Sequence, residues 1–249
     1  IPAFARRPRD LHPLRLFAAL MLEGGIWPVV ALSLKVGLVA TVVTLPLAFA
    51  LAYLLARARF PGKVLIDGLV HLPLVVPPVV TGWLLLLAFA PAGPVGGWLE
   101  RWFGVSVMFR WTGAAIAAGV MALPLMVRAM RLSIEAVDRR LEDAARTLGA
   151  TRARVFWTIT LPLSLPGVLA AAVLGFARAL GEFGATITFV SNVPGETQTL
   201  PLAIYAALQM PDGEAQVLRL ALISVALSLA ALVGSELLAR RAGRGVHAL

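Results

Sequence analysis

The ionisable side chains of this 249-residue sequence are spaced for charge pairing and docking rather than for catalysis. It contains no cysteine, and its histidines, His12, His71 and His247, are scattered, which excludes thiolate metal sites and histidine clusters. A G-x-x-x-x-G-K-[ST] phosphate loop is also absent, because Gly62-Lys63 lacks the upstream glycine and the following hydroxyl residue. A membrane-embedded enzyme would need convergent acids, a nucleophile with its base, or metal ligands, and the sequence offers none of these sets. We therefore expect no catalytic site and no bound cofactor in this chain.

One charged pair lies inside an apolar stretch. Arg178 and Glu182 are four residues apart, so they share one face of a helix and can form an ion pair. Charges within a membrane are costly, so the pair indicates a gate near the outer mouth of a pathway. A structural pair that joins helices explains the spacing equally well. Further candidates for the pathway, each also explicable as an ordinary hydroxyl or loop residue, are Thr186, Thr188, Ser191 and Asn192.

Three other ionisable residues lie in or beside apolar stretches. Lys35 is about two turns inside the first stretch, where we expect its ammonium to reach toward the outer surface, with contact to an anion as the alternative. Asp67 and His71 share a helical face at the inner end of the second stretch, close enough to the interface to be solvated.

Residues 135–162 form the most polar segment of the chain. Good helix formers from Ile134 to Leu148 predict a helix, and Gly149 stands where a left-handed residue ends one. The run from Ala153 to Leu161 predicts a second short helix lying across the membrane face, with Pro162 at the turn into the next span. This run places Val155, Phe156 and Trp157 beside Arg152 and Arg154, and such residues are typical of protein interfaces. We expect a partner protein to cover this surface.

The elements that position these residues are five apolar stretches, each long enough for the roughly 20 helical residues that cross a bilayer. They run from Pro28 to Leu55, Val64 to Pro91, Thr112 to Met130, Leu163 to Gly181, and Ala215 to Ala239. The second contains Pro73, Pro77, Pro78 and Gly82, which predict a kinked helix that either lines a pore or is bent for structural reasons.

Composition agrees with a membrane protein, since 59% of the residues are hydrophobic and 14% are charged. The net charge of +9 is explained by basic residues in cytoplasmic loops, so we expect no nucleic-acid partner. One side of the membrane receives Arg57, Arg59, Lys63, Arg128, Arg131, Arg139, Arg140, Arg146, Arg152, Arg154, Arg240, Arg241 and Arg244. We expect that side to be cytoplasmic. Only the arginines of the N-terminus argue against this placement.

The chain is therefore predicted to be an all-α integral membrane protein with one membrane domain over residues 26–241. Residues 242–249 would be a C-terminal cytoplasmic tail. Residues 1–25 would be an extension, interpreted as a short helix at the membrane interface rather than a signal peptide, because the apolar run is too short to span and no small-residue cleavage site follows.

The polar segment carries a family motif. Asp143-Ala144-Ala145, Gly149 and Ile159-Thr160-Leu161-Pro162 are spaced as in the EAA loop of binding-protein-dependent ABC importer permeases, which this sequence resembles. Asp143 stands where glutamate is usual. The resemblance implies the type I importer permease fold, with a coupling helix in residues 135–162 that docks on a separate ATP-binding subunit holding ATP and Mg. The residues it assigns to coupling are Glu142, Asp143, Ala144, Ala145, Gly149, Arg152, Phe156, Ile159, Leu161 and Pro162.

Further stretches resemble the molybdate permeases of this family. They are Phe60 to Lys63, His71 to Leu74, Ala144 to Gly149, Phe176 to Thr186, Ser191 to Thr197, and Thr199 to Pro201. The resemblance implies ATP-driven import of molybdate, or tungstate, across the cytoplasmic (inner) membrane of a prokaryote. It also implies a second copy of the permease and a periplasmic or extracellular molybdate-binding protein that sets selectivity. A sulfate or thiosulfate permease is the alternative, because those proteins share a related Leu-Gly-Glu stretch.

Overall fold

The computed structural model describes the backbone of residues 25–246 and the side chains of residues 25–234. The predicted interfacial helix of the N-terminal extension and residues 247–249 of the C-terminal tail lie outside the described residues, whereas residues 242–246 are helical. The helices are α2 (Trp27–Arg57), α3 (Lys63–Val75), α4 (Pro78–Phe89), α5 (Gly96–Phe103), α6 (Trp111–Ala136), α7 (Arg139–Thr147), α8 (Arg152–Val155), the π-helical turn η2 (Phe156–Thr160), α9 (Leu161–Leu180), α10 (Gly184–Val190), α11 (Leu200–Leu208) and α12 (Glu214–Val246). The described part of the chain contains no strand, so the all-α prediction is confirmed.

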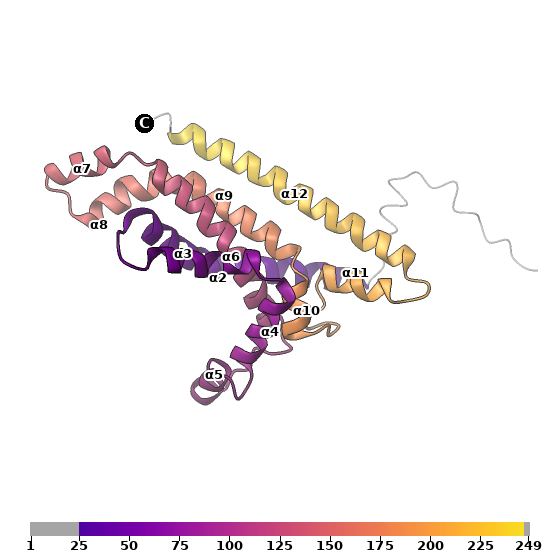
Figure 1. Cartoon of the computed structure of the whole chain (residues 1–249). Helices are drawn as coiled ribbons and strands as arrows, with labels where there is room; N and C mark the ends of the chain where they lie inside the picture. The colour runs from indigo at the N-terminus through magenta and orange to yellow at the C-terminus, as the bar shows by residue number, and fades with distance from the viewer. Residues whose placement is uncertain (1–24, 247–249) are drawn as a thin grey trace, which may run out of the picture.

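Long apolar helices account for the predicted spans. Four are long and apolar enough to cross a membrane: Trp27–Arg57, Trp111–Ala136, Arg152–Leu180 and Glu214–Gly234. They run side by side in Figure 1, with α7 and α8 at one end of the bundle and α11 toward the other. We call the α7 end the coupling end and the opposite end the distal end.

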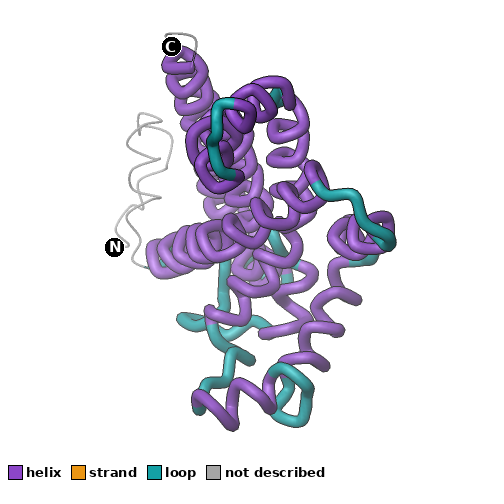
Figure 2. The backbone as a smooth tube through the Cα atoms, turned by 90° about the vertical axis from the view of Figure 1, so that its left-hand side faces the viewer, coloured by secondary structure: helices purple, strands orange, loops and turns teal. Residues whose placement is uncertain are grey.

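The second predicted span is not a single kinked helix. It is divided into α3 and α4, whose axes differ by 115°. Val76 is extended and Pro78 opens α4, so no helical hydrogen bond carries the chain across the break. In Figures 1 and 2, α4 and α5 project from the long helices instead of running along them. The prolines correctly marked the position of the break, but the predicted single kinked helix is two helices, which together are long and apolar enough for one broken span.

α6 is the centre of the packing, with α2 and α9 against it. Small residues permit close approach, as is usual between membrane helices. A Cβ atom added at Gly119 would lie 2.6 Å from Oγ1 of Thr44 on α2. One added at Gly175 of α9 would lie 2.5 Å from the sulfur of Met126. The three helices therefore form a tight unit that carries the coupling end.

Candidate functional site

α7, Gly149 and α8 form a helix–turn–helix at the coupling end, where Figure 1 shows α7 beyond the long helices and α8 leading into α9. The Asp138 carboxylate accepts a hydrogen bond from the Arg140 backbone N–H (2.9 Å) and so caps the start of α7. Gly149 has φ +87°, the left-handed conformation predicted for it. The side chain of Thr151 then caps α8 by accepting from the backbone N–H of Arg154 (3.3 Å).

Two details of the predicted segment are corrected. The helix predicted from Ile134 to Leu148 is interrupted, because α6 ends at Ala136 and α7 begins at Arg139. Pro162 is not a turn, since Arg152–Leu180 is one continuous helical run. The reason lies in the π-helical turn Phe156–Thr160, after which the N–H of Leu161 bonds to the Phe156 carbonyl. This wider turn lets the helix continue past a proline ring that would clash within an α-helix. The second short helix predicted across the membrane face is therefore continuous with α9.

Glu142 joins three elements at the coupling end. Its Oε1 accepts a hydrogen bond from Nη2 of Arg57, at the end of α2, at 2.9 Å. The same oxygen accepts from Oγ1 of Thr160, just before α9, at 2.7 Å. Glu142 is buried, with 8% of its surface exposed. Because buried charges are stable only when paired, this contact fixes α7 to the ends of two spans.

The coupling residues implied by the family motif divide into an inner and an outer set. Glu142 is turned inward, whereas its neighbours Asp143 and Ala144, and also Arg152, are exposed. Phe156 packs edge-on against Phe49 and Tyr53 of α2, with ring centroids 5.9 and 5.4 Å away. Phe156 is half-buried, so its packing against α2 accounts for part of its surface and its contact with a partner stays a prediction.

The exposed apolar surface of the coupling end is formed by other residues. Leu141, Leu148 and Trp157 are 50%, 89% and 65% exposed. Val155, which we also expected on the surface, is buried. Sequence reasoning found Trp157 but missed Leu141 and Leu148. The available signal was that Leu141 stands between Arg140 and Glu142 in a strongly amphipathic helix, and that Leu148 ends the same helix just before Gly149.

Arg178 and Glu182 form the predicted pair, and the contact also positions the next helix. Nη1 of Arg178 lies 2.6 Å from Oε2 of Glu182, whose residue is 3% exposed. Oε1 of Glu182 accepts a hydrogen bond from the backbone N–H of Ala185 (2.8 Å), in the first turn of α10. One carboxylate thus links the end of α9 to the start of α10. This is the structural pair joining helices that the sequence allowed as the alternative to a gate.

The remaining pathway candidates lie on α10 or in the loop that follows it. Thr186 is buried, and the Thr188 hydroxyl donates to the Gly184 carbonyl (2.9 Å). Ser191 has φ +62°, a sparsely populated conformation for a residue with a side chain. Asn192 has a buried Oδ1 atom without a hydrogen-bond partner.

α4 crosses α10 at a very short distance. A Cβ atom added at Gly82 of α4 would lie 2.5 Å from the carbonyl oxygen of Ala185 and 2.9 Å from Cβ of Thr188. The helix after the break in the second span therefore rests on the helix that Glu182 positions. Of the candidates, Thr188 lies at this crossing, and Glu182 is linked to it through the Ala185 N–H.

Comparisons with known proteins agree with this architecture. The Escherichia coli (strain K12) molybdenum transport system permease protein ModB is 57% identical over 222 residues, 88% of this chain and 97% of that protein. The ModB protein of Haemophilus influenzae is 59% identical over 210 residues, 84% of this chain and 92% of that protein. A solved bacterial ABC transporter involved in alginate import has a similar fold, with a TM-score of 0.71 and 17% identity over 94% of this chain and 85% of that one.

The family relationship covers most of the chain. Residues 44–244 match the model of the binding-protein-dependent transport system inner membrane component, a range that includes α7, the Gly149 turn and the α4–α10 crossing. The chain therefore belongs to the family of binding-protein-dependent transport system inner membrane components.

Proposed function

We propose that this chain is the membrane-spanning permease of an ATP-driven importer whose substrate is molybdate. The observation that carries the proposal is the buried attachment of α7 to α2 and α9 through Glu142, next to an exposed apolar surface. Such a helix can receive a partner on its outer side and transmit movement to two spans through its inner side. The choice of molybdate is supported by the two relatives named for molybdenum transport, at 57% and 59% identity.

The partner at the coupling end is a separate ATP-binding subunit, which binds ATP and Mg. Leu141, Leu148 and Trp157 supply apolar contact area for it, and Asp143 and Arg152 supply charges at the edge. Two permeases and two such subunits form the transporter. The coupling end faces the cytoplasm, because most of the basic residues gather there, and the C-terminus lies on the same side.

The mechanism is alternating access. ATP binding draws the two ATP-binding subunits together, α7 follows its partner, and the contacts of Glu142 with Arg57 and Thr160 move α2 and α9. At the far end of α9, the Arg178–Glu182 contact carries the movement to α10 and so to α4, which opens the pathway outward. ATP hydrolysis then resets the pathway.

The anion reaches the opened pathway from a binding protein on the outer side. An oxyanion can be held by backbone N–H groups and hydroxyls without a charged ligand, as anions are at helix N-termini. Selectivity therefore resides mainly in the binding protein, and Thr188, Ser191 and Asn192 supply polar groups near the α4–α10 crossing.

ATP-dependent uptake tests the substrate. The permease, its ATP-binding subunit and its binding protein are placed in proteoliposomes, and uptake of labelled molybdate is measured with and without excess sulfate. We expect uptake that requires ATP and that sulfate does not suppress. Preferential uptake of sulfate would support the alternative of a sulfate permease and refute the choice of molybdate.

A further inference from the structure

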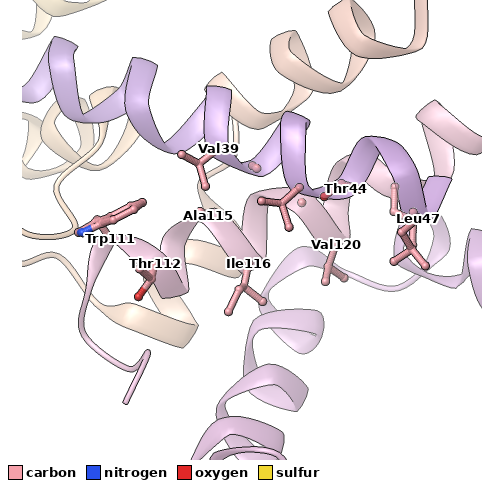
Figure 3. A pocket seen from close by; sticks show the side chains of 12 residues that line it. Val39, Thr44, Leu47, Trp111, Thr112, Ala115, Ile116 and Val120 are labelled. Atoms are coloured by element: carbon pink, nitrogen blue, oxygen red, sulfur yellow. The ribbon is translucent and has the colours of Figure 1, made fainter. Parts of the chain in front are cut away.

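A groove of about 340 Å³ runs along the surface between α2 and α6. Its α2 wall includes Val39, Val43 and Leu47, and its α6 wall includes Ile116, Val120 and Leu123. Figure 3 shows these two helices side by side, with Trp111 at one end of the lined region and Leu47 at the other. Val43 and Leu47 are 68% and 54% exposed, so the groove opens to the surroundings of the bundle.

The groove follows from the packing of the two helices. Ala40 and Ala115 are almost fully buried in its floor, and Gly119 of α6 packs closely against Thr44 of α2. Small residues bring the backbones together, and larger residues beside them form walls. The depression is therefore built by α2 and α6 themselves and does not depend on another element.

The ammonium group of Lys35 lies at the distal end of the groove. Nζ of Lys35 lies 3.7 Å from the centroid of the Trp111 ring, and Trp111 itself lines the groove. Lys35 is one helical turn before Val39 and is exposed. Among the described residues it has no carboxylate partner within ion-pair distance. The Trp111 ring contacts one side of the ammonium, so the other N–H donors of the ammonium can bind a ligand.

The length of the groove matches one leaflet. From Val39 to Leu47 the helix rises about 12 Å, and from Thr112 to Leu123 about 16 Å, at 1.5 Å per residue. Half of a hydrocarbon core of ~30 Å is about 15 Å. A tryptophan and a lysine at one end of an apolar path of this length suit the level of lipid headgroups, where Trp and Lys commonly anchor.

We propose that this groove binds a glycerophospholipid, with one acyl chain between α2 and α6 and its phosphate on the ammonium of Lys35. Charge complementarity selects this occupant, because an unpaired cation at the end of an apolar groove matches an anionic headgroup above an acyl chain. The site belongs to the leaflet at the distal end, which is the outer leaflet in the orientation proposed above. A bound acyl chain would contact both helices and thus hold α2 and α6 together.

Photolabelling tests the site. The permease with its ATP-binding subunit is placed in nanodiscs containing phosphatidylglycerol whose acyl chain carries a diazirine, and adducts are mapped by mass spectrometry. We expect adducts to concentrate in residues 39–47 and 112–123. Lys35→Gln should weaken labelling there by about fivefold, the equivalent of ~1 kcal/mol for one basic residue at an anionic headgroup. Val43→Trp should block the groove.

Two control variants separate the site from general lipid contact. Leu38→Trp enlarges an exposed α2 residue that does not line the groove, and Lys63→Gln removes a lysine at the coupling end. Both should label as the wild type does. Adducts spread evenly over the apolar surface would overturn the proposal. The proposal would also be overturned if no adducts formed in the groove. In that case, a photoreactive residue placed at position 43 that cross-links a second permease would show that another copy of the chain occupies the groove. None of these results depends on which anion is transported.

Discussion

Removing the carboxylate of Glu142 should destabilise the coupling end strongly. Glu142→Ala leaves the Arg57 guanidinium, whose side chain is 11% exposed, without a counter-charge, and Nε of Arg57 already has no partner. It also removes the acceptor of the Thr160 hydroxyl. Loss of one partner from a buried ion pair costs about 3–5 kcal/mol, most of it the cost of leaving the other charge buried.

Thermal unfolding of the purified permease complex measures this effect. At roughly 2–4 °C per kcal/mol for a chain of this size, Glu142→Ala should lower the midpoint by about 6–20 °C. The double variant Arg57→Met with Glu142→Leu should lose far less, because neither charge remains. The separate effects of the two substitutions should therefore not add.

Asp143→Ala is the matched control, since it removes a carboxylate from the adjacent residue of the same helix. Asp143 is 71% exposed in its side chain and lies 3.8 Å from an Arg146 that is itself 48% exposed. Its removal should change stability by no more than about 0.5 kcal/mol. Small and equal shifts of the unfolding midpoint for Glu142→Ala and Asp143→Ala would refute the reasoning. Additive effects of the Arg57 and Glu142 substitutions on the midpoint would refute it too.

Three further substitutions test the turn, the α4–α10 crossing and the start of α10. Gly149→Val should cost about 1–3 kcal/mol at φ +87° and uncouple ATP hydrolysis from uptake or disassemble the complex; wild-type uptake would contradict this. Gly82→Ala should reduce uptake because its Cβ would lie 2.5 Å from the Ala185 carbonyl oxygen, whereas Gly68→Ala, with open space around it, should leave uptake unchanged. Glu182→Ala should reduce uptake more than Glu182→Gln, which keeps an oxygen for the Ala185 N–H; equal uptake by both variants would count against that contact.

Features that depend on local sequence were predictable. Apolar length located the long spans, and Arg57 marks the end of the first. Gly149 was correctly expected in the left-handed conformation because its role follows from the backbone of its own turn. The Arg178–Glu182 pair followed from helical spacing alone.

Features that depend on distant residues were not predictable. Glu142 is buried because Arg57, 85 residues away in the sequence, lies beneath it. No local pattern distinguishes it from the exposed Asp143. Pro77 and Pro78 marked the break between α3 and α4, but the 115° change of direction accompanies packing of Gly82 against α10. Pro162 was misread because a π-helical turn, which no sequence rule predicted, precedes it.

Cross-linking from Leu148, the residue that follows α7, tests most directly the central claim that energy from ATP enters at the coupling end. The chain has no cysteine, so Leu148→Cys, at a residue that is 89% exposed, provides a unique attachment point for a benzophenone reagent. Val75→Cys, at an 83% exposed residue that ends α3, is the matched control. The account predicts cross-linking to the ATP-binding subunit from position 148 and not from position 75. No cross-link from position 148, or equal cross-linking from both positions, would contradict it.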